Sequence, residues 1–209
     1  VFLNCYFNNS NTNSLFEELV SNEKTDFSRY NYFYASFAAA SKKIDKAKDI
    51  VNTALKSYPR NLLLNQYKLD LNQGNYISSF DCNNKGHVIA EILYITSNAL
   101  SSQSIYSLSN FYLNLAKYLN EEFHSYDTLL AENFYKIDSF EAAKKIYDNL
   151  GKKGKAFKWH ASKQLAKIYI QDENKDKALE LVSKAYNNLA NKDIYETFDY
   201  AEFLKNNEK

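Results

Sequence analysis

Residues 28–60 read SRYNYFYASFAAASKKIDKAKDIVNTALKSYPR, and this stretch decides the fold. Its apolar side chains recur at helical spacing in two runs, Tyr30, Phe33, Tyr34, Phe37 and Ala38, then Ile44, Ala47, Val51, Ala54 and Leu55. The two runs meet at the polar tripeptide Ser41-Lys42-Lys43, which interrupts the periodicity. The pattern therefore predicts two amphipathic helices folded back on each other.

The same pattern recurs along the chain. Four segments carry a pair of small residues twelve positions apart: Ala35 and Ala47, Ser97 and Ser109, Ala131 and Ala143, and Ala166 and Ala178. Small side chains at facing positions allow two antiparallel helices to approach closely, so we expect these residues to be buried. The last three segments start 34 and then 35 residues apart, which indicates an internal repeat.

This period and these residues resemble the tetratricopeptide repeat (TPR) family. The similarity is best in residues 28–60, where Ala54 and Pro59 stand at the family's alanine and repeat-closing proline, and in residues 159–191, with QLAKIYIQDENKDKALELVSKA. The resemblance implies an all-α, right-handed solenoid of antiparallel helix pairs, for which we expect about eleven helices and no β-sheet.

The repeats define one expected domain, a single solenoid over residues 1–209. Its parts are the end of an upstream repeat at 1–27, repeats at 28–60, 90–123, 124–157 and 159–192, a degenerate repeat at 61–86, and a partial repeat at 193–209. From Ala47 to Ser109 there are 62 residues, too few for two periods. Residues 74–86 should therefore be irregular, in the place of a missing second helix.

A second resemblance concerns location. Residues 61–171 resemble alphaproteobacterial periplasmic TPR proteins through GHVIAEILYITSNAL, FYLNLAKYLN and YDTLLAENFYKIDSFEAAKKIYDNL, in that order. This resemblance favours the periplasm or cell envelope, with the cytoplasm as the alternative. Because the sequence contains no methionine, we expect it to be a fragment of a longer chain. Its oligomeric state is left open.

Composition excludes several functions. A net charge of +1 gives no positive electrostatic potential that would attract nucleic acid. No apolar run is long enough to span a membrane. His87, His124 and His160 fall on three different repeats, so we expect no catalytic residues, no metal and no cofactor.

Cys5 and Cys82 are too few for a disulfide framework and wrongly spaced for zinc, and we expect free structural thiols. The lysines of GKKGKAFK at 151–158 are expected in a solvated loop, with phosphate contact as the alternative.

A stack of helix pairs lines a concave groove with its first helices, and this groove is the expected binding surface. The residues expected to contact a partner there are Arg29, Tyr32, Tyr94, Asn98, Glu132, Tyr135, His160, Lys163 and Lys167. Tyrosine offers contact area at low entropic cost, while the polar groups suit a peptide. We expect a non-catalytic scaffold for a protein or peptide partner. The alternative is a docking or regulatory arm of an enzyme whose catalytic domain lies outside residues 1–209.

Overall fold

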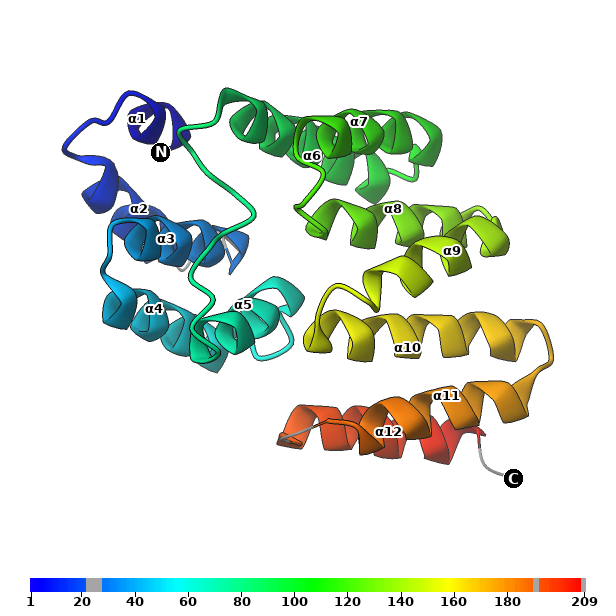
Figure 1. Cartoon of the computed structure of the whole chain (residues 1–209). Coiled ribbons are helices and arrows are strands. Elements are labelled where there is room, and N and C mark those ends of the chain that lie inside the picture. Colours follow the sequence, from blue (N-terminus) through cyan, green and yellow to red (C-terminus); the bar gives the residue numbers. More distant parts are fainter. Residues whose placement is uncertain (22–27, 190–191, 208–209) are drawn as a thin grey trace. The chain divides into compact units, whose positions relative to one another are not determined.

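The computed structural model describes residues 1–21, 28–189 and 192–207, and these residues contain twelve helices and no strand (Figure 1). The helices are α1 Phe2–Tyr6, α2 Thr12–Val20, α3 Ser28–Ala40, α4 Ile44–Ser57, α5 Leu62–Asn72, α6 Lys85–Ser102, α7 Tyr106–Leu119, α8 Ser125–Lys136, α9 Phe140–Leu150, α10 Lys155–Gln171, α11 Lys175–Asn187 and α12 Ile194–Asn207. The expected all-α class is confirmed. The helix absent from the sequence-based expectation is the short α1.

The chain divides into two compact units, Val1–Tyr126 and Asp127–Lys209. In the first unit α3 packs against α2, α4 and α5, and α6 packs against α7. In the second unit α10 packs against α9 and α11, and α11 packs against α12. The single solenoid over 1–209 stays a prediction, and its boundary at residue 27 lies outside the described residues.

The predicted register of the helix pairs is confirmed by burial. All eight small residues of the four pairs have no exposed surface. In the second pair Ser109 Oγ donates a hydrogen bond of 2.8 Å to the carbonyl oxygen of Ser97, its expected partner. Four residues further along each second helix, Val51, Leu113, Tyr147 and Val182 are at most 1% exposed.

Each of these pairs is joined by the same tight turn. One residue per turn has a left-handed backbone, seven positions after the small residue of the first helix: Lys42, Ser104, Asp138 and Glu173, with φ between 57° and 62°. In each turn the next backbone N–H bonds to the carbonyl five residues earlier, as Lys43 does to Ala38 at 2.9 Å. This is the Schellman ending of a helix. Gly74, with φ 80°, ends α5 in the same way.

The predicted irregular segment at 74–86 is confirmed up to residue 84, because α5 ends at Asn72 and α6 begins at Lys85 with no helix between them, whereas Lys85 and Gly86 belong to α6. In Figure 1 this segment runs as a thread from α5 past α3 to the start of α6. We call residues 73–84 the crossing segment. Phe80 anchors it in an aromatic core, with ring centroids 4.4 Å from Phe33 and 6.0 Å from Phe123.

The buried small residues lead to a first prediction. Replacing Ala143 by Leu should lower the free energy of unfolding by about 1–3 kcal/mol, because the added atoms must displace a neighbouring helix. Lys145→Leu introduces the same side chain at an exposed position of α9 and serves as the control. Urea unfolding of both variants measures the difference, and equal midpoints would contradict the register.

Candidate interaction surfaces

The groove face of α3 is covered from within the chain. Tyr32, expected to be exposed, is only 3% exposed, and its hydroxyl lies 3.0 Å from Ser78 Oγ and 3.2 Å from Ser79 Oγ. On the next turn Ser36 Oγ donates to the carbonyl oxygen of Phe80 at 3.5 Å. The crossing segment therefore lies on the face of α3 where a partner was expected. The expected exposure of Tyr32 is wrong for this reason.

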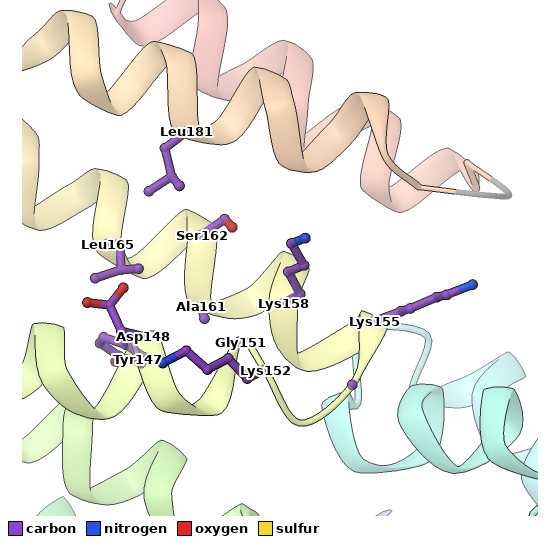
Figure 2. A pocket seen from close by; sticks show the side chains of 11 residues that line it. Tyr147, Asp148, Gly151, Lys152, Lys155, Lys158, Ala161, Ser162, Leu165 and Leu181 are labelled. Carbon is purple, nitrogen blue, oxygen red and sulfur yellow. The ribbon is translucent and has the colours of Figure 1, made fainter.

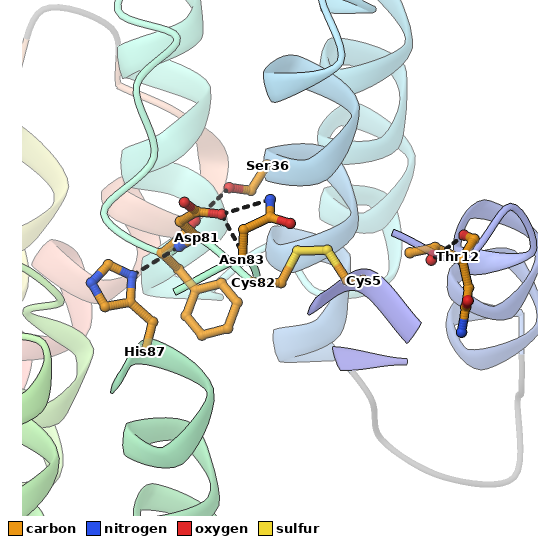
Figure 3. Close-up of a disulfide and its surroundings, with 9 residues drawn as sticks. Cys5, Thr12, Ser36, Asp81, Cys82, Asn83 and His87 are labelled. Atoms are coloured by element: carbon orange, nitrogen blue, oxygen red, sulfur yellow. Dashed lines mark hydrogen bonds between the residues drawn. A yellow bond between two sulfur atoms is a disulfide. The ribbon is translucent and has the colours of Figure 1, made fainter. Parts of the chain in front are cut away.

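A disulfide fastens the crossing segment to α1 (Figure 3). Cys82 of the segment is bonded to Cys5, with their Cα atoms 5.8 Å apart, so the expectation of two free thiols is wrong. Just before Cys82, the backbone N–H of Asp81 donates to His87 Nδ1 at 3.0 Å. Just after it, the side chain of Asn84 caps α6. The segment is thus fixed at both sides of the disulfide.

Arg29, another expected groove residue, is committed to an internal ion pair. Its Nε and Nη2 donate to the two carboxylate oxygens of Glu91 at 2.6 and 2.7 Å, and Nη1 donates to Ser125 Oγ. Glu91 has no exposed side-chain surface and Arg29 has 17%. Burial raises the pKa of Glu91 against the opposing effect of Arg29. Burial alone would lower the pKa of Arg29, but the charge of Glu91, its hydrogen bonds with Arg29 and the neighbouring Tyr94 and Tyr126 together raise that pKa.

Aromatic rings surround the guanidinium of Arg29. Its Cζ lies 3.8 Å from the ring centroid of Tyr94, 4.9 Å from that of Phe123 and 5.5 Å from that of Phe33. Such cation–π contacts are strongest when they are shielded from water. Arg29 therefore covers part of the Tyr94 ring, which is then less available to a partner. Asn98, one turn later on α6, is exposed.

In the second unit the expected groove residues lie on α8 and α10. Lys163 Nζ bonds Asp199 of α12 at 2.5 Å, so this lysine also has an internal partner. Glu132 and Lys167 are exposed, and Tyr135 is half-buried with its ring 5.6 Å from that of Phe140. Neighbouring protein atoms that displace water raise the pKa of Glu132, although its side chain keeps an exposed surface, and the charge of Lys167 opposes this rise. Glu132 and Lys167 are thus electrostatically coupled and both open to solvent.

His160 lies between α10 and α9, with its ring 6.1 Å from that of Tyr147. Its Nε2 is buried and has no hydrogen-bond partner within the described residues. Burial, followed by the charges of Lys163 and Lys167, lowers the pKa of His160 to about 4. The imidazole is therefore neutral near pH 7 and serves as a packing group rather than as a cation for an acidic partner.

A pocket of about 560 Å³ opens beside the lysine-rich turn at 151–154 (Figure 2). It is lined by Ala161 and Leu165 of α10 and Leu181 of α11, together with Lys152, Lys155 and Lys158. In Figure 2 the side chains of Lys152, Lys155 and Lys158 point in different directions. They do not converge on one point, as a phosphate site requires. Lys152 and Lys153 lie in the solvated turn, as expected, whereas Lys155 and Lys158 lie in the first turn of α10, so the expected loop ends four residues earlier than predicted.

An apolar surface that sequence reasoning missed lies on the outer side of α7. Leu108, Phe111, Leu115 and Tyr118 are 43%, 57%, 39% and 87% exposed. Their spacing of three, four and three residues places them in one stripe along the helix. The opposite side of α7 is buried through Ser109, Leu113 and Ala116. We call these four residues the α7 stripe.

The other helix pairs show that the α7 stripe is not required by the fold. Two, six and nine residues after the buried small residue, α7 carries Phe111, Leu115 and Tyr118. The equivalent exposed residues are Asp49, Thr53 and Lys56 in α4, Lys145 and Asn149 in α9 with Lys152 just after its end, and Glu180, Lys184 and Asn187 in α11. All nine are polar. A stripe of large apolar residues at positions that are otherwise solvated marks a surface for contact with another molecule.

Exposed isoleucines on α6 have a different cause. Ile92 and Ile95, five and two residues before Ser97, are 56% and 47% exposed. The helices α3, α5 and α10 pack there against the preceding second helix, which is α2, α4 and α9 respectively. The crossing segment precedes α6 and supplies no such helix. These isoleucines are therefore exposed because of the degenerate repeat.

Other kinds of site are not seen in the described residues. No group of three or more histidine, cysteine, aspartate or glutamate side chains there is arranged to hold a metal ion. None of the described helices is both long and apolar enough to cross a bilayer. The sequence matches no protein-family model, and a comparison with curated proteins finds no match.

Proposed function

We propose that this chain is a non-catalytic scaffold that binds a protein or peptide partner, and that the α7 stripe is its main contact surface. The observation that carries the proposal is that α7 has Phe111, Leu115 and Tyr118 at three positions where the other second helices have exposed polar residues. Aromatic side chains are enriched at the centre of protein interfaces, and tyrosine is among the residues that provide most of the affinity there, so Phe111 and Tyr118 are the expected anchors. A groove contact through Glu132 and Lys167 is retained as a secondary part of the proposal.

We propose further that the helix pairs belong to a right-handed solenoid of the tetratricopeptide type. Four pairs share one register and one Schellman turn, which supports a repeat origin. The Cys5–Cys82 disulfide supports an oxidising compartment, since such bonds are rare in a reducing cytosol. This agrees with an envelope location and disfavours the cytoplasmic alternative.

Site-specific crosslinking tests the binding surface. A photoreactive phenylalanine analogue placed at position 118 should give a discrete covalent adduct in native extract, because this position is 87% exposed within the α7 stripe. The same analogue at position 56, nine residues after the small residue of α4, is the matched control. An adduct that disappears on Phe111→Glu would support the proposal. Equal labelling at both positions would overturn it.

A further inference from the structure

We propose that the partner of the α7 stripe is a second copy of this chain, whose α7 packs antiparallel against the first. This inference rests on the proposed function, because it names the occupant of the same surface. The first argument is the spacing of the stripe. Leu108, Phe111, Leu115 and Tyr118 follow the three-four-three pattern of apolar positions in a coiled coil. Such a stripe fits another helix with the same spacing, and α7 itself is one.

The absence of charged residues beside the α7 stripe allows two copies of the chain to associate. The residues beside the stripe on α7 are Ser107, Tyr112 and Asn114, none of which is charged. In heterospecific helix pairs, flanking charges select the partner, and like charges oppose self-pairing. Neither effect operates here. A helix that selects its partner through flanking charges would find no complementary charge here, and a second copy meets no like charge that would repel it.

The direction of pairing follows from the helix dipole. Lys117, the one charged residue of α7, lies on the side of the helix away from the stripe and does not enter the contact. A parallel pair would align the two helix dipoles, while an antiparallel pair sets the positive N-terminal end of each helix beside the negative C-terminal end of the other. The resulting pair has a twofold axis, as most homodimers do. Phe111 then faces Leu115 of the other copy, and Leu108 faces Tyr118.

The available area predicts a weak dimer. At about 200 Å² for a full large side chain, the four stripe residues expose on the order of 450 Å² in each copy. Two copies would bury about 900 Å² through these residues alone, near the lower limit of about 1,000 Å² for a specific interface. We therefore expect dissociation in the micromolar range rather than a permanent dimer.

Sedimentation velocity over a micromolar concentration series tests the inference. The wild-type chain should shift from monomer to dimer as its concentration rises. Phe111→Glu and Leu115→Lys should each stay monomeric over that series, because each places a charge against an apolar residue of the other copy. Thr53→Lys, at the position of α4 equivalent to Leu115, should dimerise like the wild type. A wild-type chain that remains monomeric throughout would overturn the inference.

A mixture of the two variants tests the direction of the helices. In the antiparallel dimer, Glu at position 111 of one variant meets Lys at position 115 of the other, and the second Phe111–Leu115 contact is retained. Mixing the variants should therefore restore a dimer that neither forms alone. Failure of the mixture, with a dimer in the wild type, would overturn the antiparallel pairing.

The crosslinking experiment separates this inference from the proposed function. An adduct at position 118 with twice the mass of the chain supports a second copy. An adduct of any other mass, lost on Phe111→Glu, would uphold the interaction surface and overturn the homodimer. The absence of any adduct would overturn both.

Discussion

The Glu91→Gln variant is expected to unfold with a free energy about 3–5 kcal/mol lower than that of the wild type, the cost of leaving one member of a buried ion pair alone. Glu91 accepts two hydrogen bonds from Arg29 and has no exposed side-chain surface. The amide cannot neutralise the guanidinium, which is held among aromatic rings. Urea unfolding at neutral pH measures the loss, with Glu180→Gln on the exposed side of α11 as the control.

Two further variants identify the cause of this loss. Arg29→Met leaves Glu91 without its partner, so burial should raise the pKa of Glu91 further above its ordinary value of 4.5. The folded state then binds a proton more tightly than the unfolded state does. The stability of this variant should therefore be greatest below pH 4.5 and fall as the pH rises through the raised pKa.

A double Arg29→Met, Glu91→Met variant should recover part of the lost stability at pH 8. A pH-independent loss in Arg29→Met would contradict the explanation.

Removal of the disulfide is the second change expected to have a large effect. The double variant Cys5→Ser, Cys82→Ser should lose about 2–4 kcal/mol of stability, because the bond joins residues 77 positions apart and restricts the unfolded chain. The wild type treated with a dithiol reductant should show the same loss. The reductant should leave the double variant unchanged, which makes that variant the control. Equal urea midpoints for oxidised and reduced wild type would contradict the prediction.

The periodicity of the sequence is sufficient to predict the helix pairs, but it does not predict the contacts between one pair and another. Ala35 and Ala47, or Ala166 and Ala178, could be paired from the sequence because each pair is local and its residues must be small. The irregular residues 73–84 followed from counting, since 62 residues cannot hold two full periods. The first inference depended on neighbours within one repeat, and the second on the distance between successive repeats.

Contacts between distant parts of the chain had no comparable signal. The partners Arg29 and Glu91 are 62 positions apart, and Cys5 and Cys82 are 77 positions apart. Nothing in the periodicity of α3 indicates that the crossing segment covers Tyr32. The α7 stripe, in contrast, was visible in the sequence. Comparing the outer positions of the four second helices, rather than their buried positions, would have shown that Phe111 and Leu115 replace polar residues.

The disulfide also determines how the chain would carry mechanical load. A pulling force applied to the two ends of the chain passes from Cys5 directly to Cys82 through the covalent bond. The helices α2, α3, α4 and α5 lie between the two cysteines, so no tension passes along their backbone while the bond is intact. The 76 residues between the two cysteines, which would otherwise extend by about 3.3–3.6 Å each, add no length while the bond is intact. Reduction of this one bond would therefore convert a short tether into a long one.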